Sequence, residues 1–229
     1  MGGTLKQAIS IALSALVALS LAACSAPAAA PQEGATGTAA PVTTAPAEDA
    51  ASASAQPSVL PAGKFKLTTK AGAEITFTLP TPATDPRVKA LEAFRVKAGG
   101  APVAYLVADV DNRKGSEAVN MYMVSAFDAD GIQYTFSTVT DAIDIWKPTY
   151  QADGTYKMAN GKVLDDATGS PLSEQGTDLY NANINDADKA ERTTIILQSP
   201  IVDLPDTFTR VSVQPSGAGE GEDATPAGT

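Results

Sequence analysis

Hydrophobic and polar residues alternate along several short segments of this chain. Ile75, Phe77 and Leu79 alternate with two threonines before Pro80, a two-residue period that predicts a half-buried strand. Five further strands are predicted within residues 103–110, 119–127, 132–136, 193–197 and 208–213, most of them joined by short turns. Because helices do not alternate with these strands, the pattern predicts an antiparallel β-sandwich rather than a doubly wound parallel sheet.

Helical spacing follows the first of these strands. Asp85 and Pro86 supply a cap and a first helical position, and apolar residues then recur at helical spacing as far as Phe94. Two glycines at positions 99 and 100 mark the end of this pattern. The sequence therefore predicts one short helix inside a mainly β domain.

A long insertion, residues 137–191, separates the strand at 132–136 from the strand at 193–197. Connections beyond about 12 to 15 residues are usually functional or disordered. Disorder is not expected here, because the insertion holds the only tryptophan, Trp146, and three of the six tyrosines. A hairpin is predicted around Asn160-Gly161, and a helical turn or two over 171–184.

The two ends of the chain have a different composition. Residues 1–23 contain Lys6 and an apolar stretch that ends in small residues, the layout of a secretory signal peptide. Residues 25–62 are dominated by Ala, Pro, Ser and Thr, and residues 215–229 by Gly, Ala, Pro and acids. Such segments bury too little apolar surface to fold. We therefore expect a disordered stalk after Cys24, one folded domain over 63–214, and a disordered acidic tail over 215–229.

Composition removes several classes of chemistry. The chain has no histidine and a single cysteine, so it can form neither a histidine-dependent catalytic triad nor a thiolate zinc cluster. Its 26 acidic residues against 16 basic ones argue against nucleic acid as a partner. No cofactor is expected.

Acidic residues concentrate in the insertion, which has ten of them against four lysines. We weigh three roles for it. Trp146, Tyr150 and Tyr156 are candidates for the anchoring patch of a protein, peptide or glycan-binding surface. The alternative is that these aromatics form a small core under the long loop.

A calcium site is the second role considered for the insertion. Oxygen-bearing side chains recur at Asn181, Asn183, Asn185, Asp186 and Asp188, in the manner of a calcium-binding loop. The glycine expected at the sixth position is missing, and Arg192 stands where a carboxylate is expected. A solvated acidic face is the alternative.

Acid–base hydrolysis by two carboxylates is the third role. Asp141 and Asp144, close to Trp146 in the sequence, are the first pair to consider. Acids are numerous in this chain, so such a pair carries little specificity.

The chain resembles known proteins in two respects. Leu21-Ala22-Ala23-Cys24 resembles the lipobox of bacterial lipoproteins. This resemblance implies a thioether-linked diacylglycerol on Cys24, cleavage before it, and often a further acyl chain on its amine. Because Ser25 is not aspartate, it also implies no retention at the inner membrane of a two-membrane bacterium, and an outward-facing protein in a single-membrane cell.

The second resemblance lies in the order of the strand motifs. The segments YLVADVDNRKG, DADGIQYTF, ERTTIILQSP and FTRVSV resemble, in pattern and order, the telokin-like, immunoglobulin-like sandwich domains of bacterial extracellular lipoproteins. This resemblance covers about 140 residues and implies a location and a fold, without a chemistry.

Together these observations predict an immunoglobulin-like antiparallel β-sandwich with one short helix and a long acidic insertion. The expected protein is lipid-anchored at the cell membrane, on its extracytoplasmic face, and acts as a non-catalytic binding or interaction module for an unidentified protein, peptide or glycan. The alternatives are a calcium-binding or carboxylate-based envelope hydrolase and a purely structural component of the envelope.

Overall fold

A computed structural model describes residues 59–217 and 219–228 of the chain. This part is mainly β, with 38% strand and 20% helix, and its sheets are antiparallel. Both features confirm the predicted class. The signal peptide, Cys24 and the stalk as far as residue 58 lie outside the described residues.

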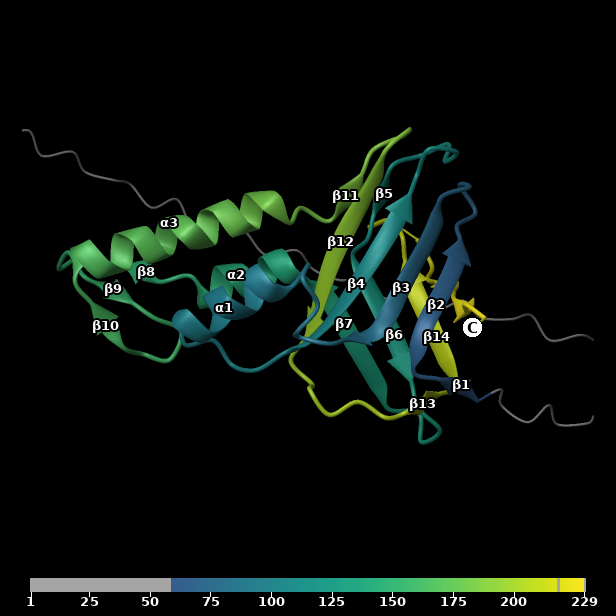
Figure 1. Ribbon diagram of the computed structural model, residues 1–229, viewed down its shortest axis with the longest axis horizontal. Coiled ribbons are helices and arrows are strands. Elements are labelled where there is room, and N and C mark those ends of the chain that lie inside the picture. The colour runs from purple at the N-terminus through teal and green to yellow at the C-terminus, as the bar shows by residue number, and fades with distance from the viewer. Residues whose placement is uncertain (1–58, 218, 229) are drawn as a thin grey trace, which may run out of the picture. The chain divides into compact units, whose positions relative to one another are not determined.

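The largest sheet contains nine strands in the described part of the chain (Figure 1). Residues alternate between its two faces, and Ile75, Phe77 and Leu79 point into the buried core as their spacing predicts. The seven longer strands are, in spatial order, β14 (Arg210–Gln214), β6 (Met123–Phe127), β7 (Gln133–Thr138), β12 (Arg192–Ser199), β4 (Ala104–Asp111), β3 (Glu74–Thr81) and β2 (Gly63–Thr68).

These strands fall into two groups, β14-β6-β7 and β12-β4-β3-β2. β12 pairs with β4 along its whole length, but with β7 only at Leu197 and Gln198. Side chains from both groups fill one core, which includes Phe65, Val124 and Phe136. The sheet therefore bends around its own apolar interior.

The C-terminal segment bridges the two outer strands of this sheet. β15 (Glu222–Asp223) pairs with β14, and β16 (Thr225–Pro226) pairs with β2. Only Ala224, which is buried, separates them, so the sheet nearly closes into a barrel. The expectation of a disordered tail is therefore wrong for residues 219–228. Backbone pairing to two strand edges orders this segment, and composition does not reveal such pairing.

At the other end, the folded domain begins earlier than the predicted boundary at residue 63. β1 (Leu60–Pro61) pairs with β13 (Thr207–Phe208), and the Ala62 amide donates to the carbonyl of Asp206. The predicted strand over 119–127 is interrupted, because β5 (Val119–Asn120) pairs instead with β11 (Asp186–Ala187).

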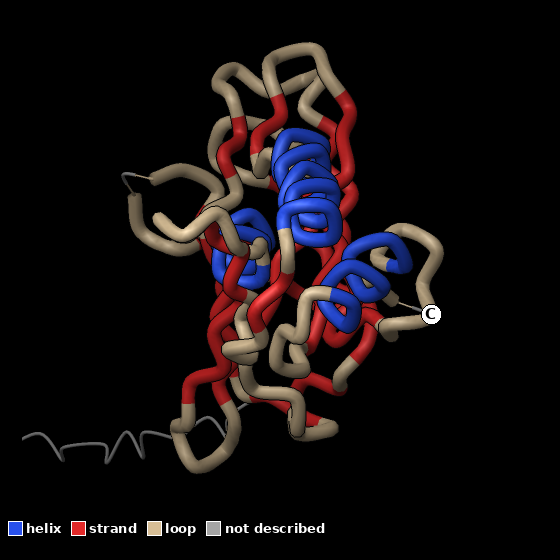
Figure 2. Tube along the Cα trace, turned by 90° about the vertical axis from the view of Figure 1, so that its left-hand side faces the viewer, coloured by secondary structure: helices blue, strands red, loops and turns tan. Residues whose placement is uncertain are grey.

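Three helices occur in the described residues, where one was predicted. They are α1 (Lys89–Lys97), α2 (Val139–Trp146) and α3 (Asp166–Ala182), and they lie together on one side of the large sheet (Figures 1 and 2). A small sheet of β8 (Thr149–Tyr150), β9 (Tyr156–Lys157) and β10 (Val163–Leu164) accompanies them and confirms the predicted hairpin. We call these elements the helical layer. They share a second core with Tyr105, Val107 and Ile196 of the large sheet.

The helix α3 is much longer than the predicted turn or two. Gly169, Pro171 and Gly176 lower its helix propensity, which hides it in the sequence. The glycines have a packing reason, since a Cβ at Gly169 would clash with Tyr156 and one at Gly176 would crowd Phe94. None of the helices in the described residues is long and apolar enough to cross a membrane.

Candidate functional site

The outer face of β4 carries both apolar and charged side chains. Tyr105 and Val107 are covered by the helical layer, whereas Asp109 and Asp111, on the same face, are not. Two rows of residues cross the uncovered part of the sheet. Thr76, Asp109 and Thr194 form one row, and Glu74, Asp111 and Arg192 form the next.

Three adjoining depressions follow these rows. Their volumes are about 310, 350 and 480 Å³. The first and second share Thr76 and Asp109, and the second and third share Glu74, Asp111 and Arg192. They therefore form one continuous channel along the sheet surface, which we call the outer groove.

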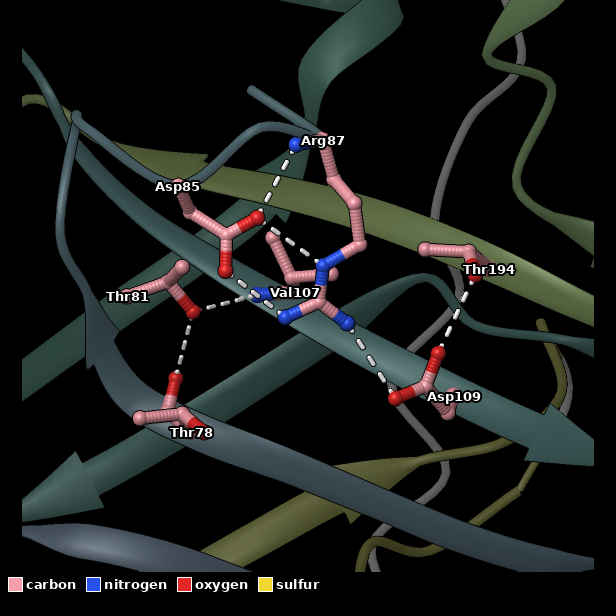
Figure 3. Close-up of polar contacts among 7 residues, drawn as sticks. All are labelled: Thr78, Thr81, Asp85, Arg87, Val107, Asp109 and Thr194. Atoms are coloured by element: carbon pink, nitrogen blue, oxygen red, sulfur yellow. Dashed lines mark hydrogen bonds and ion pairs between the residues drawn. The ribbon is translucent and has the colours of Figure 1, made fainter. Parts of the chain in front are cut away.

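Arg87 stands at the end of the outer groove next to the helical layer. The chain reaches it through an irregular end of β3, where the Thr81 hydroxyl accepts from the Val107 amide at 2.9 Å and donates to the Thr78 carbonyl at 2.9 Å (Figure 3). Asp85 then accepts from the Arg87 amide at 2.9 Å instead of capping a helix, and α1 begins only at Lys89. This turn returns the Arg87 side chain to the sheet.

The Arg87 guanidinium joins two carboxylates (Figure 3). Its Nε and Nη2 donate to Asp85 at 3.0 and 2.8 Å, and its Nη1 donates to Asp109 at 3.2 Å. Asp109 also accepts from the Thr194 hydroxyl at 3.1 Å. The hydrogen bonds from Arg87 lower the pKa of Asp85 to about 2, so this carboxylate stays ionised at neutral pH.

The other end of the outer groove repeats the arrangement with the charges exchanged. Asp111 lies between two arginines, Arg113 at 2.6 Å and Arg192 at 2.8 Å. Hydrogen bonds from Arg113, with a further one from Arg192, hold the pKa of Asp111 well below its usual range. Lys114 approaches Glu74 at 3.5 Å.

Lys64 lines the first depression and differs from these charges. It is exposed, and none of the ion pairs between described residues includes it. It is therefore a cation in the outer groove that is free to meet a ligand.

Two carboxylates at the groove, Asp85 and Asp111, lack the electrostatics of a general acid. A carboxyl group that donates a proton near neutral pH needs a raised pKa. Asp85 and Asp111 instead have lowered pKa values, because arginines stabilise their charged forms. The groove presents fixed charges and hydroxyl groups.

The predicted aromatic patch is not an open surface. Trp146 is only 3% exposed and lies in the core of the helical layer, against Gly100. Its assignment as an exposed anchor is wrong, because α2 turns it inward with Ile143. Tyr150 is exposed and Tyr156 half-buried, and their rings meet edge to face at 5.2 Å.

The carboxylate pair of the insertion lies on the solvent side of α2. Asp141 and Asp144 are both exposed, and Asp144 pairs with Lys147 at 3.1 Å. Neither residue lines the outer groove.

The calcium candidates do not surround a common point. Asn183 lies just beyond α3 and its amide donates to the Leu179 carbonyl at 2.7 Å, while that of Asn185 donates to Asn120 at 2.6 Å. Asp186 is in β11, and Asn181 and Asp188 are exposed. Across residues 59–217 and 219–228 no group of three or more Asp, Glu, Cys or His side chains could hold a metal ion. An extended strand follows the helix here, so the segment does not wrap as a calcium loop does.

Sequence reasoning missed the outer groove. The two aspartates in the strand motif VADVDN were a usable signal, because they break an otherwise apolar strand on one face. The partnership of Arg87 with Asp109 was not readable, since it depends on a contact 22 residues apart.

Compared with known proteins, the chain matches no family model, no curated protein and no solved structure at a significant level.

Proposed function

We propose that this protein is a lipid-anchored binding module of the bacterial cell envelope that presents the outer groove to a ligand on the extracytoplasmic side. The observation that carries the proposal is the groove itself. The helical layer covers one part of the sheet face and leaves the adjoining part open, with paired charges already held in place. Side chains fixed by neighbours lose little conformational freedom on binding a ligand.

Anchoring rests on the sequence Leu21-Ala22-Ala23-Cys24, which resembles a lipobox. Replacing Cys24 by alanine removes the thiol that would carry the lipid. We expect the full-length protein to partition into the detergent phase of a cell extract and Cys24→Ala to partition into the aqueous phase. Ser25→Ala is the matched control and should behave as the unchanged protein. Equal detergent-phase recovery of Cys24→Ala would contradict anchoring at this residue.

An immunoglobulin-like relationship of the sheet is part of the proposal. It is supported by the two groups of antiparallel strands, β14-β6-β7 and β12-β4-β3-β2, which enclose one core and are paired to each other only over short stretches. In this proposal the C-terminal segment is an addition that closes one side of a sandwich. A crystal structure in which the two groups pack face to face as separate layers would support it, and an evenly paired barrel would contradict it.

A binding role and a purely structural role predict different behaviour toward the insoluble envelope fraction of the host. A binding module should sediment with this fraction after detergent extraction, and a double variant, Lys64→Ala with Arg192→Ala, should sediment several times less. Lys157→Ala with Lys162→Ala, in the helical layer, is the matched control with the same charge change. Equal sedimentation of both double variants would argue for a structural role without a groove ligand.

A further inference from the structure

We infer that the ligand of the outer groove is a polysaccharide whose carboxylates are widely spaced along the chain. This inference rests on the proposed binding function and names the substrate class of the same site. Its basis is the order of charges among the lining residues of the groove, with cations at both ends and the carboxylate of Asp109 between them.

The charges can be followed along the strands. At the first end, Lys64 and Arg87 outweigh Asp85. In the middle row, Asp109 stands between Thr76 and Thr194 and is 57% exposed. Lys66 pairs with Thr76 at the β2 end of this row and does not line the depressions.

The far end of the groove is again positive. Arg113, Lys114 and Arg192 outweigh Glu74 and Asp111. Four residues along β4, from Val107 to Asp111, separate the rows at the two ends, which corresponds to about 13 Å of extended strand. Two anionic groups of one ligand would therefore have to lie more than about 10 Å apart to meet both positive ends.

Hydroxyl groups suit the space between these ends. The carboxylate of Asp109 has about four acceptor sites, of which Arg87 and Thr194 use two, so it can accept from ligand hydroxyls. Thr76 is exposed beside it and can both donate and accept. A sugar unit offers several hydroxyls over a short length, which matches this polar middle row.

Other ligand classes fit the groove less well. β3 and β4, which form its floor, are paired on both sides, so no strand edge is open there for an extended peptide. Phe65 and Phe77 are buried in the inner core, so among the described lining residues there is no aromatic surface on which a neutral sugar could stack. A densely charged polyanion would place charge against Asp109. The remaining class is a hydroxyl-rich chain with sparse negative charge.

Binding of defined oligosaccharides tests this inference. The full-length protein in detergent micelles is titrated with hyaluronan oligosaccharides, in which every second sugar bears a carboxylate. Neutral chitin oligosaccharides of equal length and inorganic polyphosphate are the comparison ligands. We expect binding of the hyaluronan probe that weakens with salt, and at least about tenfold weaker binding of the other two.

Point variants then locate the binding. Lys64→Ala and Arg192→Ala should each weaken the hyaluronan interaction about five- to tenfold. Lys157→Ala is the matched control, because Lys157 is exposed in β9 of the helical layer and lines none of the three depressions. An equal loss in Lys157→Ala would show unspecific charge attraction and overturn the inference.

The remaining outcomes separate the two proposals. Equal or tighter binding of the neutral or the polyphosphate probe, or no binding of the hyaluronan probe, overturns the ligand class. The binding function would still stand if the unchanged protein sediments with the envelope fraction and the Lys64→Ala, Arg192→Ala double variant sediments much less. Loss of that sedimentation difference would overturn both.

Discussion

The outer face of β4 and β12 is divided between two environments that are only two residues apart. Tyr105, Val107 and Ile196 are nearly inaccessible to solvent under the helical layer. Asp109 and Arg192, farther along the same strands, are 57% and 66% exposed and are held by ion pairs. Burial of apolar area stabilises a fold strongly, whereas exposed ion pairs contribute about 0 to 1 kcal/mol. One pair of strands thus serves the fold at one end and is free to serve a ligand at the other.

This difference makes the two regions separable by mutation. Changes in the covered region should lower the free energy of unfolding, and changes in the outer groove should leave it nearly unaltered while altering binding.

The largest loss of stability is expected at Trp146. Its ring lies in the core of the helical layer, so Trp146→Ala removes buried area and leaves a cavity. The free energy of unfolding should fall by about 3 to 5 kcal/mol, measured by urea denaturation followed by circular dichroism.

Ile145→Ala provides the matched control for this experiment. Ile145 is the preceding residue of α2 and is 72% exposed, so its replacement should cost less than about 0.5 kcal/mol. A loss below about 1 kcal/mol for Trp146→Ala would mean that the helical layer contributes little to the folded domain, and the contrast between the two regions would fail.

The second-largest loss of stability is expected at Asn112, the buried residue that follows Asp111 at the end of β4. Asn112 is inaccessible to solvent, and its Nδ2 donates to the carbonyls of Glu117 at 2.9 Å, Ala187 at 3.0 Å and Asp188 at 3.1 Å. Asn112→Ala would remove the buried amide that these carbonyls share and should lower the unfolding free energy by about 2 to 3 kcal/mol in urea denaturation.

A second substitution at the same position checks the cause. Asn112→Asp keeps the shape of the side chain but replaces its donor by an acceptor, so it should be at least as destabilising as alanine. If Asn112→Asp were as stable as the unchanged protein, the hydrogen bonds donated to Glu117, Ala187 and Asp188 would not stabilise the fold.

A smaller loss of stability is expected at Tyr105, whose hydroxyl group is a polar contact within the covered region. The Tyr105 hydroxyl donates to Glu92 at 3.0 Å, and burial, with the nearby Glu92 carboxylate, raises the pKa of Tyr105. Tyr105→Phe should lower the unfolding free energy by about 1 kcal/mol through the lost hydrogen bond. Thermal denaturation measures it against Tyr150→Phe, a change at a 61% exposed ring that should have no effect. Equal melting temperatures for both variants would contradict the role given to this bond.

The predictable part of this fold is the part with local signals. β3 follows from alternating apolar and polar residues, β4 and β12 follow from runs rich in β-branched residues, and the β9–β10 hairpin follows from Asn160-Gly161. α3 and the C-terminal strands were missed for one common reason. Both are stabilised by contacts with residues distant in sequence. Tyr156 and Phe94 pack on glycines of α3, and the edges of β2 and β14 pair with the C-terminal strands.

The sequence pointed to the wrong region for the candidate site, for a similar reason. Aromatic and acidic composition pointed to the insertion, but Trp146 is used for packing and Asp141 and Asp144 for the solvated side of α2. The groove residues are spread over four strands and two turns, so only the register of the sheet brings Thr76, Asp109 and Thr194 into one row.

The smallest effect concerns the groove itself and depends on pH. The pKa of Asp85 is lowered from an ordinary value of 3.8 to about 2 by hydrogen bonds from Arg87. A carboxyl group with a lowered pKa in the folded state stabilises that state above its unfolded pKa, and this contribution disappears as pH falls through the folded pKa. Because the ion pair is largely solvent-screened, we expect at most about 1 kcal/mol.

Asp85→Asn should therefore be less stable than the unchanged protein by this small amount at pH 6, and the difference should shrink between about pH 4 and pH 2. Paired urea titrations at closely spaced pH values measure it, with Asp141→Asn on the exposed side of α2 as the control. A difference above about 2 kcal/mol, or one that grows on acidification, would mean that Asp85 serves the fold rather than the groove. The boundary between the covered and open regions would then lie beyond Arg87, and the first end of the outer groove would belong to the structural half of the sheet.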